Sequence, residues 1–234
     1  IGSWASPRPH EGSGEGVDAH RTVLKGEALR SAQAGYFGLI NHIDDQITWL
    51  LREFQAKSRK MDRPWLILVT SDHGEMLGDH YYFRKCEPYE GSAHIPLLIR
   101  GSDDLGLQPG VRCDRPVALE DLMPTLLDLA GVEIPEEVDG VSLVPVLRGE
   151  SAEVRPYLHG EHAPCYSEAQ AYHFLTDGGM KYVWRPADGS EQLFDLVRDP
   201  QERIDLSDRE AREDELARWR GRLIDILRDR PERF

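Results

Sequence analysis

The chain has 234 residues, 40% hydrophobic and 30% charged, which is typical of a folded globular protein and excludes a disordered one. Its 42 acidic and 28 basic side chains give a formal net charge of −14, which argues against a nucleic acid as partner. No apolar run reaches about 18 residues, so we predict no membrane-spanning segment. The three cysteines lack CxxC spacing, which argues against a disulfide framework or a zinc knuckle.

Three regions follow one another along the chain. Residues 1–25 are rich in glycine, serine and proline without periodicity, so we expect a loop or linker. Residues 26–149 predict part of an α/β domain, and residues 150–234 predict a small antiparallel α+β subdomain. Because the first residue is Ile1 and not methionine, we expect translation to begin further upstream.

The α/β region opens with a long helix. Apolar side chains recur at three- and four-residue spacing from Glu27 to Phe54, which predicts one apolar stripe along an amphipathic helix. Residues 65–70 are a short apolar run with branched side chains. Such a run favours a strand that is buried on both faces, as in a parallel sheet.

A second strand and a second helix complete this region. Residues 95–99 are again apolar, and Pro96 places them at a strand start or at a sheet edge. Residues 119–130 have helical apolar spacing and end at Gly131, a residue that commonly terminates helices.

The C-terminal region predicts a sheet followed by a helix. Residues 172–176 and 180–184 flank an Asp-Gly-Gly turn, which is a strong hairpin signal. Residues 192–196 predict a third strand. An amphipathic helix of about 20 residues is expected from Asp208 onward.

A candidate site follows the first strand, at Asp72 and His73. In open α/β sheets, ligands bind at the carboxyl ends of strands. A carboxylate and an imidazole side by side can turn toward one divalent ion, and Gly74 allows a sharp turn after them. The same residues also fit a plain turn in which Asp72 caps a helix and His73 is merely exposed.

The neighbouring sequence extends this pattern in a fixed order along the chain. The segments are residues 36–47, 69–80, 85, 88–90, 92–100, 121–131, 139–143 and 193–200. Together they resemble the sulfatases of the alkaline-phosphatase superfamily, and they cover nearly everything from residue 27 onward. The resemblance implies a mostly parallel sheet flanked by helices, followed by the small C-terminal subdomain.

The resemblance also implies roles for individual residues. Asp72 and His73 match the second pair of metal ligands of the family, on a calcium-type ion, with Mn²⁺, Mg²⁺ and Zn²⁺ as alternatives. Lys85 matches the lysine that contacts the sulfate and stabilises charge in the transition state. As an alternative, Lys85 is an exposed surface lysine.

Two further histidines are weaker candidates for substrate binding. His94 lies next to a strand start, where it approaches the site or hydrogen-bonds within its own loop. His162 belongs to the run His159-Gly160-Glu161-His162, in a region where related enzymes bring a loop toward the substrate. It contributes to specificity or is a turn histidine.

The nucleophile of the family is missing. It derives from the Cys or Ser of a Cys/Ser-x-Pro-x-Arg motif, whereas Cys86 is followed by Pro88 but then by Glu90. Cys113 and Cys165 lack the proline. We therefore expect the C-terminal part of a sulfatase, inactive alone, whose partner is a missing N-terminal part and whose substrate is a small-molecule sulfate ester.

Two alternatives stay open. The parent enzyme is a phosphonate or phosphate ester hydrolase of the same superfamily, or the chain is a stand-alone module without catalysis. The sequence also permits a homo-oligomer. It does not distinguish a cytoplasmic from a periplasmic location.

Overall fold

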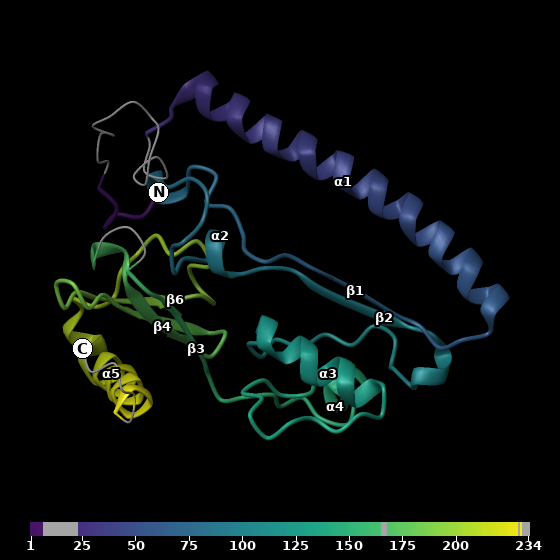
Figure 1. The fold of residues 1–234 in the computed structure, drawn as a ribbon. Coiled ribbons are helices and arrows are strands. Elements are labelled where there is room, and N and C mark those ends of the chain that lie inside the picture. The colour runs from purple at the N-terminus through teal and green to yellow at the C-terminus, as the bar shows by residue number, and fades with distance from the viewer. Residues whose placement is uncertain (7–22, 165–167, 229, 231–234) are drawn as a thin grey trace.

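The computed structural model describes residues 1–6, 23–164, 168–228 and 230 (Figure 1). No helix among these residues is long and apolar enough to cross a membrane. The elements are α1 (Gly26–Met61), β1 (Leu66–Thr70), α2 (Glu90–Ala93), β2 (Leu97–Gly101), α3 (Leu122–Leu129), α4 (Val144–Leu147), β3 (Leu158–His162), β4 (Tyr172–Thr176), β5 (Met180–Trp184), β6 (Glu191–Asp195) and α5 (Glu213–Leu227).

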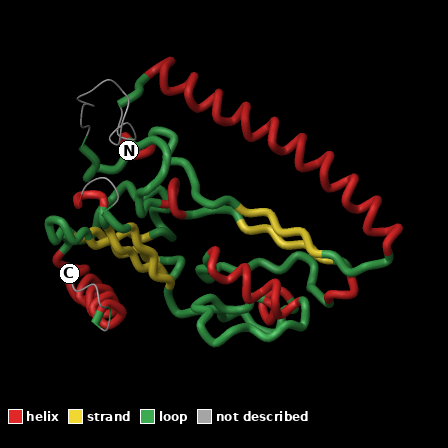
Figure 2. The backbone as a smooth tube through the Cα atoms, in the orientation of Figure 1, coloured by secondary structure: helices red, strands yellow, loops and turns green. Residues whose placement is uncertain are grey.

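The strands form two antiparallel sheets (Figure 2). β1 pairs with β2 in a long two-stranded ribbon. β3, β4, β5 and β6 follow one another in a four-stranded meander. This confirms the predicted C-terminal hairpin and its third strand, whereas β3 was expected as a loop or turn.

The pairing of β1 differs from the sequence prediction. Its apolar run favoured a strand buried on both faces of a parallel sheet, but β1 is antiparallel to β2 and all five of its residues are half-buried. Only β2 pairs with β1 in the described part of the chain, so its other edge has no strand beside it. A continuous apolar run reports a preference for burial and does not determine strand direction.

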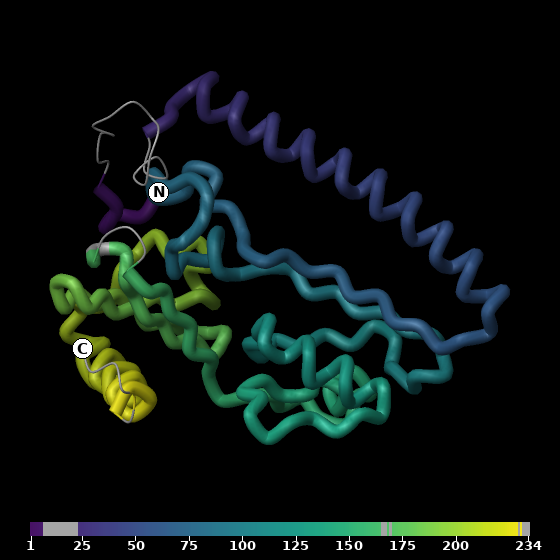
Figure 3. Tube along the Cα trace, in the orientation of Figure 1, coloured from purple at the N-terminus to yellow at the C-terminus, as the bar shows by residue number. Residues whose placement is uncertain are grey.

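Helix α1 confirms the predicted amphipathic helix but does not bury its apolar stripe. It runs as one long rod beside the β1–β2 ribbon (Figures 1 and 3), and none of its residues is buried. The contacts that hold it involve Gln33, which donates to the carbonyl of Leu77, and Phe54, which meets Trp65 edge-on. The exposed large apolar residues of α1 are Phe37, Leu39, Ile40, Ile43, Trp49, Leu50, Phe54 and Met61.

The main core lies between the meander and helix α5. Leu175, Tyr182 and Leu193 from the sheet pack against one face of the helix. Trp219 at the centre of that face is 1% exposed. The charged face of α5 stays in solvent, as its periodicity predicted.

The first residues of the chain are anchored on the other face of the meander. Trp4 packs beside Tyr89 and Phe194, and its indole N–H donates to the carbonyl of Glu202 at 2.7 Å. The amide of Gly2 donates to Nδ1 of His80. Residues 1–6 are irregular as predicted, but they are packed into the fold; residues 7–22 of the predicted linker lie outside the described part.

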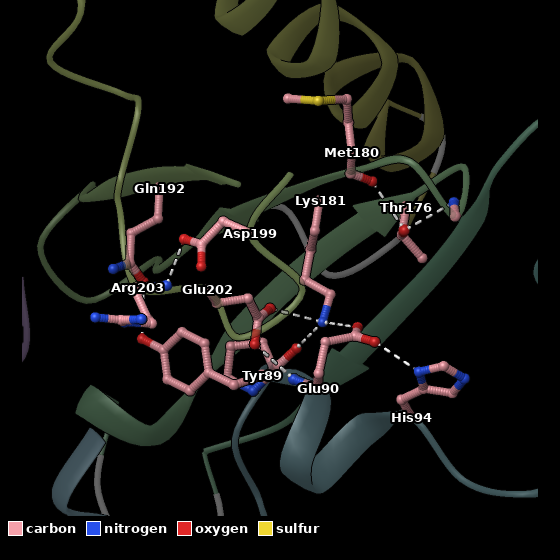
Figure 4. Close-up of polar contacts among 12 residues, drawn as sticks. Tyr89, Glu90, His94, Thr176, Met180, Lys181, Gln192, Asp199, Glu202 and Arg203 are labelled. Carbon is pink, nitrogen blue, oxygen red and sulfur yellow. Dashed lines mark hydrogen bonds and ion pairs between the residues drawn. The ribbon is translucent and has the colours of Figure 1, made fainter. Parts of the chain in front are cut away.

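A buried lysine joins the loop after β1 to the meander (Figure 4). Nζ of Lys181, whose side chain is 1% exposed, lies 2.5 Å from Glu90 and 2.8 Å from Glu202, and it donates to the carbonyl of Pro88. Burial alone would raise the pKa of Glu90, but hydrogen bonds from His94 and Lys181 lower it to about 2. Burial raises the pKa of Glu202. Both carboxylates lie close enough to Nζ to balance the charge of Lys181.

A second buried ion pair fixes the segment before β3. Asp121 is fully buried, and both of its carboxylate oxygens accept hydrogen bonds from Arg155, at 2.5 and 2.7 Å. The same oxygens accept the amides of Ala118 and Val141. Burial would raise the pKa of Asp121, but these hydrogen bonds outweigh it and lower the pKa.

Replacing Lys181 by Met tests the first tie. The variant leaves Glu90 and Glu202 without their counter-charge, and breaking such a buried pair costs about 3–5 kcal/mol. We expect a loss of that size in the free energy of unfolding, measured by urea denaturation. The exposed Lys60→Met on α1 is the matched control and should change it by less than about 0.5 kcal/mol. A loss below about 1 kcal/mol in the free energy of unfolding for Lys181→Met would show that this network does not stabilise the fold.

Replacing Asp121 by Asn tests the second tie through pH. Because the folded-state pKa of Asp121 is lowered, its charge stabilises the fold above the ordinary pKa near 3.8, and this stabilisation is lost as pH falls through the folded value. We expect Asp121→Asn to cost about 3 kcal/mol at pH 7. The difference from the wild type should shrink below about pH 4. A difference that stays constant from pH 7 to pH 3 contradicts the assignment.

Candidate functional site

The turn after β1 brings its side chains to the carboxyl end of that strand. Ser71 Oγ donates to the carbonyl of His73 at 2.6 Å, and Asp72 accepts the amide of His73 at 3.0 Å. Gly74 is needed here for close packing, not for an unusual φ: a Cβ would lie 2.2 Å from the carbonyl oxygen of Gly91. The turn is therefore pressed against helix α2.

The side chains of Asp72 and His73 lie close together. Nε2 of His73 lies 3.5 Å from Oδ2 of Asp72, whose side chain is 84% exposed. Nδ1 of His73 donates to the carbonyl of Gly74 at 2.8 Å, so in the neutral ring Nε2 carries the lone pair. A backbone carbonyl that fixes the tautomer in this way is typical of metal-binding histidines.

Lys85 completes the cluster. Its Nζ lies 2.9 Å from Nε2 of His73, and its side chain is exposed. The slight desolvation of Asp72 would raise its pKa, but the neighbouring His73, backbone hydrogen bonds and Lys85 lower it. The structure thus brings together the three residues that the sequence singled out, around one point at the end of β1.

This arrangement suits part of a site for a divalent cation. A carboxylate oxygen and an imidazole nitrogen lie 3.5 Å apart, and the ammonium of Lys85 lies beside the imidazole. Among the described residues, no third carboxylate, imidazole or thiolate lies close enough to Asp72 and His73 to bind the same metal ion.

Glu75 positions the loop that carries Lys85. One oxygen of Glu75 accepts the amides of both Leu77 and Arg84. Several non-glycine residues of this loop have left-handed backbone angles: Leu77, His80, Tyr81, Arg84 and Cys86. Such conformations persist where the surroundings impose them, often at functional sites. No sequence signal separated Glu75 from the other acidic residues nearby.

His94 and His162 lie in other surroundings. His94 Nδ1 lies 2.6 Å from Glu90, which raises the pKa of His94 and places it in the Lys181 network (Figure 4). This is the contact within its own loop that the second interpretation anticipated. His162 ends strand β3 and stacks on Tyr172, so it is a strand residue and not a turn histidine. Their roles toward substrate stay predictions.

Comparison with known proteins identifies relatives over the whole chain. A family model described as sulfatase matches residues 2–132, and one described as N-sulphoglucosamine sulphohydrolase, C-terminal, matches residues 78–229. An arylsulfatase of Clostridium perfringens is 35% identical over 100% of this chain and 48% of its own length. A choline-sulfatase of Rhizobium meliloti is 36% identical, over 78% of this chain and 34% of its own length.

Solved structures agree. A phosphonate monoester hydrolase of Silicibacter pomeroyi superposes with a TM-score of 0.74 at 32% identity, over 88% of this chain and 43% of its own. A protein in complex with its substrate D-glucosamine-2-N,6-O-disulfate gives 0.71 at 25% identity, with the same shares of both chains. These neighbours confirm the predicted α/β fold class.

The chain spans about half the length of the clostridial relative and about a third of the choline-sulfatase. Because each of the two family models matches more than half of its residues, the chain belongs to the sulfatase family.

Proposed function

We propose that this chain is the C-terminal part of an enzyme that hydrolyses sulfate esters. In this proposal Asp72 and His73 bind a divalent metal ion and Lys85 binds the sulfate group. The observation that carries it is the convergence of these three side chains at the end of β1, with contacts of 3.5 and 2.9 Å. Membership of the sulfatase family supports the reaction class.

The donor set fits a metal ion but does not select one. One carboxylate and one imidazole are compatible with Ca²⁺, the ion implied by the sequence resemblance, and with Mn²⁺, Mg²⁺ or Zn²⁺. When bound, such an ion supplies positive charge for the oxygens of the sulfate.

Lys85 supplies a second positive charge. Its Nζ donates to the lone pair of His73 Nε2, the same lone pair that a metal ion uses. When a metal ion binds that lone pair, Lys85 no longer donates to His73, and its ammonium can donate to sulfate oxygens. A compact ammonium suits the charge that develops on those oxygens in the transition state.

The remaining parts of the active site are proposed to come from a preceding part of the same enzyme. The present chain has no Cys/Ser-x-Pro-x-Arg sequence, and it spans half or less of the relatives given above. The exposed apolar stripe of α1 and the free edge of β1 are the surfaces on which that part would pack. The proposed partner therefore supplies the nucleophile, the other metal ligands and the surface that packs against the apolar stripe of α1.

A phosphonate or phosphate ester hydrolase is the second candidate. It is favoured by the structural likeness to the hydrolase of Silicibacter pomeroyi. Turnover of an aryl sulfate and of the matching aryl phosphonate by the full-length enzyme separates the two. We expect the larger kcat/KM for the sulfate; a larger value for the phosphonate would replace the sulfatase assignment.

Replacement of Asp72 or Lys85 by Ala tests the site in the full-length enzyme. Loss of one charge-stabilising group in an active site costs about 10²–10³ in kcat, and we expect at least that for either variant with an aryl sulfate. Asp72→Ala should also weaken metal binding in a calorimetric titration, whereas Lys85→Ala should not.

The matched control is Lys60→Ala on the exposed face of α1, which should retain full turnover. Wild-type turnover in both Asp72→Ala and Lys85→Ala would eliminate the site. Loss of metal binding in Lys85→Ala would instead reassign that lysine to the metal site.

A further inference from the structure

A second cluster of metal-ligand side chains lies on the C-terminal sheet. His159 and Glu161 are two residues apart on β3, so they lie on the same face of the strand. His173 of β4 stands directly opposite Glu161 in the antiparallel register. Strand alternation and register therefore bring all three side chains onto one face.

The donor atoms of these side chains form a small triangle. Nε2 of His159 lies 3.1 Å from Nδ1 of His173, and Oε2 of Glu161 lies 3.4 Å from His173 Nδ1 and 3.9 Å from His159 Nε2. Tetrahedral Zn²⁺ with ligands at about 2.0–2.2 Å holds neighbouring ligand atoms about 3.3–3.6 Å apart. The triangle thus has nearly the dimensions of three vertices of such a site.

The two rings lie in contact. They stack almost parallel, 5.3 Å apart, and His173 is nearly fully buried. One ring N–H donates the 3.1 Å hydrogen bond to the other ring, so metal binding needs that proton to move to the second nitrogen of its own ring. A neutral imidazole keeps a lone pair on one nitrogen, which is the form that binds metal ions.

Glu161 provides the charged ligand and the opening to solvent. Its side chain is 42% exposed, which leaves room for a water molecule as a fourth ligand. Arg230 also pairs with Oε2 of Glu161. A carboxylate oxygen has lone pairs for both a guanidinium and a metal ion.

We propose that His159, Glu161 and His173 form a binding site for a transition-metal ion of the zinc class, separate from the Asp72–His73 pair. Two imidazoles and one carboxylate select Zn²⁺ over Ca²⁺ and Mg²⁺, which prefer oxygen ligands. The bound ion would link β3, a polar edge strand, to the neighbouring strand β4 of the meander. The proposed site joins two strands, has an open position for water, and does not depend on the proposed sulfatase activity.

The test is a calorimetric titration of Zn²⁺ into the purified protein in the presence of excess Ca²⁺. We expect one equivalent to bind, and saturating Zn²⁺ to raise the melting temperature. His159→Gln and Glu161→Gln should each weaken binding by at least about 100-fold and abolish the thermal shift. His42→Ala, which removes an exposed histidine from α1, is the matched control and should bind like the wild type.

Two further measurements keep the result interpretable. Melting temperatures without metal show whether each variant is folded, and Co²⁺ in place of Zn²⁺ should give the visible absorption of a four-coordinate ion in the wild type but not in Glu161→Gln. The Zn²⁺ equivalent should persist in Asp72→Ala. Loss of that equivalent in Asp72→Ala, or unchanged binding in folded His159→Gln and Glu161→Gln, would overturn the proposal.

Discussion

The buried ammonium of Lys181 is the interaction on which the arrangement of this chain depends. It lies in the meander and reaches Glu90 of α2, Glu202 beyond β6 and the carbonyl of Pro88. Desolvating an ammonium costs several kcal/mol, which only close opposite charges and hydrogen bonds repay. These contacts therefore fix the position of the loop after β1 relative to the C-terminal sheet.

The site is built outward from that tie. Glu90 begins α2, Gly91 of α2 packs against Gly74, and Gly74 follows the Asp72–His73 pair. Each step is a close backbone or ion-pair contact with little freedom, so α2 determines where the two candidate ligands lie. Lys85 is positioned separately. Glu75 accepts two backbone amides in the preceding loop and so fixes the segment that carries Lys85. Preorganisation of this kind is what charge stabilisation in a transition state requires.

Much of the fold and of the candidate site was predictable from sequence. The other features were not, for physical reasons. Helix α1 and the hairpin of β4 and β5 have strong periodic or turn signals, and Asp72, His73 and Lys85 stand in a recognisable motif. Strand β3 has polar residues where apolar ones normally mark a strand, so it was mistaken for a loop. The direction of β1, the anchoring of Trp4 and the burial of Lys181 depend on partners far away in the sequence, which local patterns do not report.

In the proposed function, this chain contributes only part of a metal site. Its most direct test is the Ca²⁺ affinity of the 234-residue chain compared with that of the full-length enzyme, measured under identical conditions. Affinity for Ca²⁺ depends on the number and charge of the oxygen ligands. We expect the chain alone to bind Ca²⁺ at least about 100-fold more weakly. Equal affinities would show that the chain holds a complete site, which would eliminate the proposed division of the metal site.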